Sequence, residues 1–268
     1  MQRFTYALAA TDLPKGFGYQ LYGALNALAG DPLAASWHEA RHPRVSQHLY
    51  WADGTFYWRV ALWGDLAESD RLSAAEADLA DRLAGLDRLT VAGRVFTLEG
   101  QAHEALTLES LLHHHLADQD PPDRLNLVLR SPLAFKRRGH FDPLPQPDLM
   151  VQSLINRWGA ALEADTDRME TYRAMAGDQV WPARLRLRTT AVPIKGSHIP
   201  GSLGEVQLIL KAGDPLRRFL ALLFALGEWS GIGVKTALGM GGLDVAFPGW
   251  TSLPASAMIR APKETTEE

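Results

Sequence analysis

The predicted helices and strands follow one order twice along the chain, and this repeat limits the fold more than any other feature of the sequence. The first copy consists of a strand at 2–10, a helix at 18–30, two strands within 45–63, a helix at 73–86 and a strand at 89–100. The paired strands turn at Asp53-Gly54, which is typical of a tight hairpin. Ser73 and Glu76 form a capping box that starts the second helix. The order is β-α-β-β-α-β.

The second half repeats this order after a proline- and aspartate-rich break at 117–123. Its segments are a strand at 124–130, a helix at 148–162, strands at 183–194 and 203–211, a helix at 214–226 and a strand at 243–247. The sequence therefore predicts an α+β protein of two tandem ferredoxin-like (RRM-like) βαββαβ domains, residues 1–120 and 121–268. A single mixed α+β domain is the alternative.

A glycine-rich stretch, "GEWSGIGVKTALGMGG" (227–242), follows the last predicted helix. It fails the Walker pattern because Gly233 stands one place too early before Lys235-Thr236. It fails the dinucleotide pattern because those two residues occupy the last glycine position, and because a helix rather than a strand precedes it. We therefore expect a glycine-rich loop in which Lys235 and Thr236 lie where backbone amides can approach phosphates. A merely flexible connection would not normally contain Trp229, Ile232 and Met240.

Composition excludes several classes of protein and permits a polyanionic partner. There is no cysteine, so disulfides and thiolate metal sites are excluded. No segment has a signal-peptide pattern or transmembrane length, so we expect a cytoplasmic protein without a membrane partner. The chain has a net charge of −4, but residues 124–218 carry 15 basic and 9 acidic residues. This local excess fits either a nucleic-acid partner or a solvated basic face.

Four stretches resemble the CRISPR-associated endoribonucleases of the sixth Cas family, members of the RAMP superfamily that cut precursor CRISPR RNA within each repeat. They are "YQLYGALNALAGDPLAASWHEA" (19–40), "SPLAFKRRGHFDPLPQPDLMVQSLINRW" (131–158), "IKGSHIPGSLGEVQLIL" (194–210) and "SGIGVKTALGMGG" (230–242). The glycine-rich and central stretches are the more specific ones. The family has two tandem ferredoxin-like domains, in agreement with the repeat.

The resemblance also implies roles for particular residues. The glycine-rich loop would contact RNA and brace the two domains, through Gly231, Gly233, Lys235 and Thr236, and Lys195 is carried over as a further RNA-binding residue.

Metal-independent RNA cleavage needs a base near the 2′-OH, an acid for the leaving 5′-oxygen, and positive charge beside the phosphate. In the family a histidine just after the first helix moves the proton, and a basic residue follows it. His38 and Arg44 match these places, Tyr22 matches a tyrosine that some members use, and His42 is the rival for the proton role. The usual Lys-Pro-Phe-like stretch is replaced by Arg44-Val45, which leaves Arg41 open as the cation. Without the resemblance, these histidines also fit exposed loop positions.

No metal or cofactor is expected. The run "LHHHL" (112–116) places three successive histidines about 100° apart on a helix, so they cannot converge on one ion, and surface histidines are expected instead.

Two basic clusters are candidates for binding RNA. Arg184, Arg186 and Arg188 alternate along a strand and share one face, which favours a phosphate track over a charge-protected sheet edge. "FKRRGH" (135–140) is expected to be a loop whose Lys136, Arg137 and Arg138 could grip a duplex stem.

The sequence thus predicts an endoribonuclease that processes precursor CRISPR RNA without metal, leaving a 2′,3′-cyclic phosphate and a 5′-hydroxyl. Its expected partner is CRISPR repeat RNA, with effector-complex subunits as further candidates. A non-catalytic RNA-binding subunit of such a complex is the alternative function. The sequence does not fix the oligomeric state, and a homodimer is among the assemblies it allows.

Overall fold

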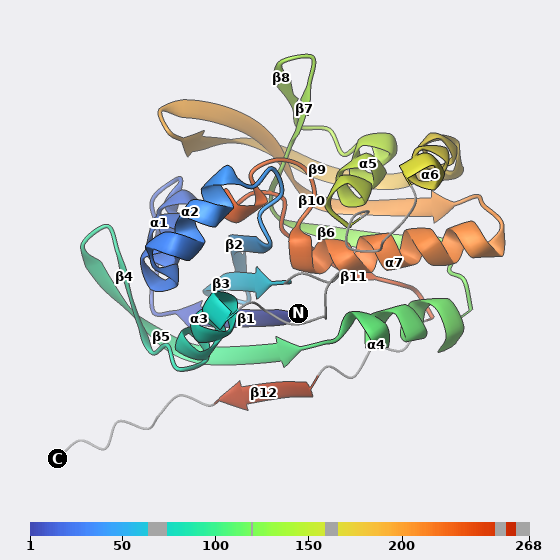
Figure 1. The fold of residues 1–268 in the computed structure, drawn as a ribbon. Helices are drawn as coiled ribbons and strands as arrows, with labels where there is room; N and C mark the ends of the chain where they lie inside the picture. The colour runs from blue at the N-terminus through green and yellow to red at the C-terminus, as the bar shows by residue number, and fades with distance from the viewer. Residues whose placement is uncertain (64–73, 119, 159–165, 250–255, 261–268) are drawn as a thin grey trace.

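The computed structural model describes residues 1–63, 74–118, 120–158, 166–249 and 256–260. It contains two antiparallel sheets and a short separate hairpin, with helices packed on and between them (Figure 1). The α+β class predicted from the sequence is confirmed.

The first sheet is built from the N-terminal half of the chain. Its elements are β1 (Gln2–Leu8), α1 (Phe17–Ala29), α2 (Asp31–Glu39), β2 (Val45–Ala52), β3 (Thr55–Leu62), α3 (Ala74–Ala84), β4 (Arg88–Val91) and β5 (Arg94–Ala105). The strands lie in the order β5-β1-β3-β2, and β4 pairs with β5. Counting β5 as the fourth strand, this is the spatial order 4-1-3-2.

The second sheet has the same spatial order. After α4 (Leu108–His113) and the single-turn π-helix His114–Asp118 come β6 (Arg124–Leu133), β7 (Phe135–Arg137), β8 (His140–Asp142), α5 (Pro147–Trp158), α6 (Thr166–Gln179), β9 (Val180–Ile194), β10 (Ser197–Leu210), α7 (Asp214–Ser230), the 3₁₀ turn Thr236–Leu238, β11 (Leu243–Ala246) and β12 (Ser256–Arg260). The sheet order is β11-β6-β10-β9. Two tandem ferredoxin-like folds, as predicted, account for both sheets.

Several local predictions were wrong. The segment after α1 was expected to be a loop that bears His38, but Gly30 ends α1 and Asp31-Pro32 at once begin α2. Proline is favoured in a first helical turn, so the stop signal is also a start signal. The strand expected at 89–100 is a hairpin of β4 and β5, and the loop expected at 135–140 is the β7–β8 hairpin. The expected capping residue Ser73 lies outside the described residues.

The β4–β5 and β7–β8 hairpins were missed because of the first residue of each turn. Four tight turns place two successive residues at positive φ: Asp53-Gly54, Ala92-Gly93, Arg138-Gly139 and Lys195-Gly196. Asp-Gly is a strong sequence signal for this turn, whereas alanine and arginine rarely adopt positive φ. The β2–β3 hairpin, predicted at Asp53-Gly54, is confirmed.

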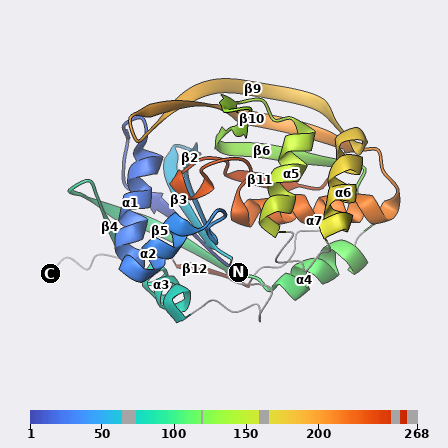
Figure 2. The same ribbon diagram turned by 45° about the horizontal axis from the view of Figure 1, so that its top comes forward.

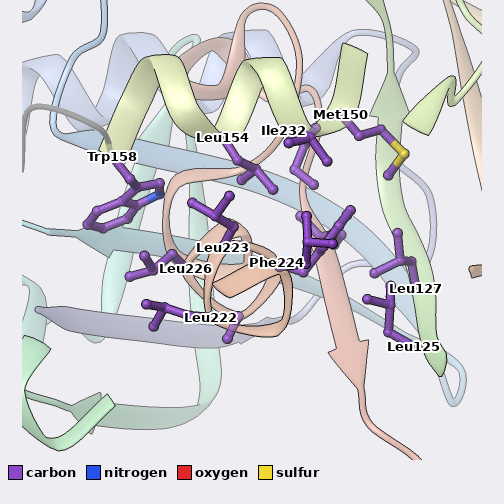
Figure 3. Packing of buried hydrophobic residues seen from close by; sticks show 14 of the residues in the cluster. Leu125, Leu127, Met150, Leu154, Trp158, Leu222, Leu223, Phe224, Leu226 and Ile232 are labelled. Carbon is purple, nitrogen blue, oxygen red and sulfur yellow. The ribbon is translucent and has the colours of Figure 1, made fainter. Parts of the chain in front are cut away.

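Helix α7 lies between the two sheets (Figure 1). The helix predicted at 214–226 is confirmed, and its second half is buried on nearly every side, including Leu222 and Leu226. A helix that is apolar all round needs cover all round. Figure 3 shows its side chains packed against Leu154 and Trp158 of α5 and against the glycine-rich stretch at Ile232. The same cluster contains Met1, Ala61 and Trp63 from the first half.

The C-terminal part of the chain returns to the first sheet. Strand β12 pairs antiparallel with β5, from Ser256 opposite Ala105 to Arg260 opposite Gln101. Because this strand of the second half belongs to the first sheet, the division into domains of residues 1–120 and 121–268 stays a prediction. None of the described helices is both long and apolar enough to cross a membrane.

Candidate active site and RNA-binding surface

The residues predicted to move protons lie where α1, α2 and β2 meet. His38 is exposed in the last turn of α2, while Tyr22 is buried on α1. Their rings meet edge-on, with centroids 6.3 Å apart. The structure thus brings together two of the four candidate catalytic residues.

His42 follows α2 and faces the second half of the chain. Burial, then the positive charges of Arg157 and Arg41, lower the pKa of His42 below its ordinary value. Arg157 belongs to α5, so the α2–β2 connection lies close to a helix of the other ferredoxin-like unit. A lowered pKa keeps the His42 imidazole neutral at neutral pH, which is the form that can accept a proton.

Arg44 and Arg41 differ in their surroundings. Arg44 is half-buried directly before β2, and its carbonyl oxygen accepts a hydrogen bond from the backbone N–H of Trp63 at 3.2 Å. Arg41 is exposed. The assignment of the cation to Arg44 or Arg41 remains a prediction.

The glycine-rich loop folds back on itself and against β6. The N–H of Ile232 donates to the Gly241 carbonyl at 2.9 Å, and the N–H of Val234 donates to the Ala134 carbonyl at 2.9 Å. Gly233 and Gly241 have φ of +82° and +69°, and a Cβ at either would lie 2.3 Å from the Ala134 oxygen or 2.0 Å from the Ile232 oxygen, respectively. Only glycine permits both this backbone conformation and this close approach.

Helix α5 holds the loop at Gly233. The N–H of Gly233 donates to Ser153 Oγ at 2.8 Å, and Arg157 Nη2 donates to the Gly233 carbonyl at 2.8 Å. Both polar groups of one glycine are therefore bound by side chains one helical turn apart. Neither side chain was singled out from the sequence, although Arg157 stands three residues after the buried Leu154 and so on the inward side of the helix.

The other side of the loop is bound to the first half of the chain through Gln47. This buried side chain donates from Nε2 to the carbonyls of Gly18, at 2.8 Å, and Ala237, at 3.1 Å. Its Oε1 accepts a hydrogen bond from Trp58 Nε1 at 3.0 Å. The loop is thus in contact with both ferredoxin-like units, as expected of a brace between them.

The loop residues predicted to bind RNA differ in exposure. Lys235 is exposed with φ of +60°, whereas Thr236 is only 2% exposed. The methyl group of Thr236 packs where a side chain on Gly231 would lie. In this structure Thr236 and Gly231 thus pack within the loop, while Lys235 presents its charge at the surface. Their contact with RNA remains a prediction.

The predicted basic clusters are exposed on the second unit. Arg184, Arg186 and Arg188 line one face of β9, the edge strand of its sheet, and Arg186 lies 3.8 Å from Glu205. Lys136, Arg137 and Arg138 lie on the exposed β7–β8 hairpin, and Lys195 lies in the turn between β9 and β10. Figure 2 shows the β9–β10 hairpin extending between α6 and α1. Pro193, near their turn, contacts Gly16 before α1.

A charged cluster that the sequence did not predict joins the two units. Asp244 of β11 accepts hydrogen bonds at 2.5 Å from Arg59 of β3 and Arg130 of β6. Burial acts to raise the pKa of Asp244, but the charges and hydrogen bonds of the two arginines outweigh it and lower the pKa to about 2. The sequence signal for this cluster was the position of Asp244 between the apolar residues Leu243 and Val245.

His48 is buried beside this cluster. Its ring lies against Gly242, where a Cβ would be 2.2 Å from ring atoms. Burial, followed by the charge of Arg59, lowers the pKa of His48 well below its ordinary value, although Asp244 acts in the opposite direction. His115, expected to be a surface histidine, is also buried, and its pKa is lowered to about 3 by burial and His114.

The lowered pKa values of His48 and His115 predict that the protein loses stability in mild acid. Because their pKa values are lower in the folded state, the unfolded chain binds more protons below about pH 6.5. The free energy of unfolding should therefore fall as the pH drops from 7.5 to 5, by up to ~1.4 kcal/mol per pH unit for each such histidine. Urea unfolding followed by circular dichroism at several pH values measures this slope. A flat profile over this range would contradict the buried, neutral state of His48 and His115.

The fold defines the class first: a protein of two tandem ferredoxin-like units. Solved structures with this fold include a Cas6 product complex, with TM-score 0.72 and 21% identity over 91% of this chain and 99% of that one. Thermus thermophilus Cas6 has a TM-score of 0.66 and 23% identity, over 91% and 98%. An RAMP protein binding different RNA substrates has a TM-score of 0.57.

Sequence comparison finds similarity to one family over less than half of the chain. The model of CRISPR-associated endoribonuclease Cas6 matches residues 127–243. The Cas6 endoribonuclease of Streptococcus thermophilus is 27% identical over 120 residues, which are 45% of this chain and 49% of that protein. The Mycobacterium tuberculosis (strain CDC 1551 / Oshkosh) Cas6 is 29% identical over 115 residues, 43% of this chain and 36% of that protein. The matches thus span half or less of these relatives' length. Together with the shared fold, these matches support the resemblance to the Cas6 endoribonucleases that the sequence showed.

Proposed function

We propose that this protein is an endoribonuclease that cleaves precursor CRISPR RNA within its repeats. The observation that supports this best is the glycine-rich loop, bound by α5 on one side and by Gln47 on the other, beside the histidine-bearing α2–β2 connection. Relatives matched in sequence are described as Cas6 endoribonucleases, and structures with the same fold are described as product and substrate mimic complexes.

The reaction we propose uses side chains rather than a metal ion. The 2′-OH attacks the adjacent phosphate, its proton passes to a histidine, and a protonated group returns one to the leaving 5′-oxygen. His38 is the leading candidate for proton transfer, with Tyr22 beside it; His42 is the alternative. The products are a 2′,3′-cyclic phosphate and a 5′-hydroxyl.

The direct test is cleavage of a candidate repeat RNA in excess EDTA. We expect cleavage to persist, because side chains can supply all the proton transfers and charge that the reaction requires. A 2′-deoxy nucleotide before the cut should abolish cleavage and leave binding intact, since the nucleophile is removed. Loss of activity in EDTA with recovery in Mg²⁺ would contradict the mechanism. Binding without any cleavage would favour a non-catalytic RNA-binding subunit of an effector complex.

We propose that the arginines of β9 bind the RNA backbone. Replacing Arg184, Arg186 and Arg188 with glutamine should weaken binding and flatten the log–log salt dependence by up to ~0.7 per lost contact with single-stranded RNA. Filter binding at several salt concentrations measures the slope. The matched control removes the same charge from exposed positions on the first unit: Arg82, Arg88 and Arg94. Equal slopes for both triple variants would show that this face of β9 does not contact RNA.

A further inference from the structure

Arg157 is a buried cation without an acidic partner among the described residues. Its side chain projects from α5 at the junction of the two units, and the residue is only 8% exposed. Nη2 donates to the Gly233 carbonyl, while Nε is buried without a hydrogen-bond partner. Burial lowers the pKa of Arg157 to about 10, so it remains a cation at neutral pH.

Two other largely buried arginines of the chain are paired. Arg3 forms a salt bridge with Glu104, and Arg59 forms one with Asp244. A buried charge is costly unless an opposite charge or several hydrogen bonds compensate it. In the described part of the chain Arg157 has one carbonyl in this role, which uses one of its five N–H donors. Among the described residues, then, no anion compensates the charge of Arg157.

The neighbours of Arg157 indicate which anion would compensate this charge. It holds the glycine-rich loop at Gly233, and its charge acts on His42 in the α2–β2 connection. The predicted proton-transfer residues lie in this connection or beside it. A planar guanidinium with free N–H groups suits the oxygens of a phosphodiester.

We propose that Arg157 binds the scissile phosphate of the RNA, an assignment that rests on the proposed function. It reaches the phosphate from the second unit, while the histidines approach from the first. Arg157 then supplies positive charge to the phosphate as the 2′-oxygen attacks, a role that the sequence had left between Arg44 and Arg41. The hydrogen bond to Gly233 fixes the guanidinium in the loop before RNA arrives.

The test compares removal of the charge from the protein with removal of the charge from the RNA. Repeat RNAs carry a 2′-deoxy nucleotide before the cut and one methylphosphonate, placed in turn at each linkage near it. Wild type should lose roughly 10- to 150-fold in affinity when the scissile linkage is neutral, the range for a hydrogen bond to a charged group. Arg157→Gln, which removes the charge, should lose that affinity with unmodified RNA and lose little more with the neutral linkage.

Two variants separate phosphate binding from a structural role. Arg157→Lys keeps the charge and should retain much of the sensitivity to the neutral linkage even if it is less stable. Arg173→Gln is the matched control, since Arg173 lies on α6 and donates to Asn156 at 3.0 Å. It should respond to the methylphosphonate as wild type does. Circular dichroism confirms that each variant is folded at the assay temperature.

The outcomes distinguish this proposal from the proposed function. Cleavage of all-ribose repeat RNA by wild type is measured in parallel, and its absence contradicts the enzyme assignment alone. If the losses of RNA affinity caused by Arg157→Gln and by the methylphosphonate are non-additive at the cleaved linkage, they support the role of Arg157. Additive losses at every linkage, or coupling at a linkage other than the cleaved one, overturn it. Suppose that wild type binds RNA without cutting it. In that case, non-additive losses of affinity at one linkage still identify Arg157 as a phosphate ligand, whereas additive losses at all linkages overturn that role.

Discussion

Replacing His38 with alanine should slow cleavage of repeat RNA by roughly 10²–10⁴-fold, the usual contribution of a positioned acid or base. His38 is exposed at the end of α2 and adds little to an interface dominated by phosphate contacts, so RNA binding should barely change. Single-turnover cleavage at saturating protein measures the chemical step separately from binding. His113→Ala, at an exposed position on α4, is the control and should cut at the wild-type rate.

His42→Ala tested alongside decides between the two histidines. If His38→Ala cuts normally and His42→Ala does not, the proton role belongs to the half-buried imidazole that faces Arg157. If neither substitution matters and 2′-deoxy RNA is still cut, the endoribonuclease mechanism is wrong.

Replacing Gly241 with alanine should destabilise the protein by about 3 kcal/mol or more. The left-handed backbone alone costs an L-residue ~1–2 kcal/mol. The new Cβ would also lie 2.0 Å from the Ile232 carbonyl oxygen, so the loop would have to open. Chemical denaturation measures the loss of stability, and RNA binding should fall with it.

Gly139→Ala provides the matched control for this prediction. Gly139 has φ of +84°, but apart from its own chain neighbours no described residue has an atom within 4 Å of the position that its Cβ would take. Its substitution should lower the stability only by the ~1–2 kcal/mol that the left-handed backbone costs an L-residue. Equal losses for the two variants would mean that the close approach within the loop is unimportant for stability.

The sequence predicted the arrangement of the strands because each strand carries its own local signal. Alternating apolar residues and the Asp53-Gly54 turn identified the elements, and their repeated order implied two ferredoxin-like units. The short hairpins were missed because their turns depend on Ala92 and Arg138 at positive φ, which tertiary contacts impose against local preference. Helix α2 was missed because Gly30-Asp31-Pro32 ends one helix and begins the next.

For the candidate site, the sequence could supply residue types but not the contacts between the two halves. It led to His38 and Tyr22 through resemblance, and the structure places their rings together. Gln47, Ser153 and Arg157 carry no motif of their own. They became visible as site residues only when the fold placed them around the glycine-rich loop, up to 190 positions away in the sequence.

Helix α7 and its apolar surroundings have a consequence for the engineering of this protein. The two repeats share one topology, yet Met1, Ala61 and Trp63 belong to the same apolar cluster as α5, α7 and β6. A half-chain cut near residue 120 would expose that shared surface to water. The two halves are therefore not interchangeable modules. Grafting one half onto a relative would require the graft to carry its partner's complementary side chains as well.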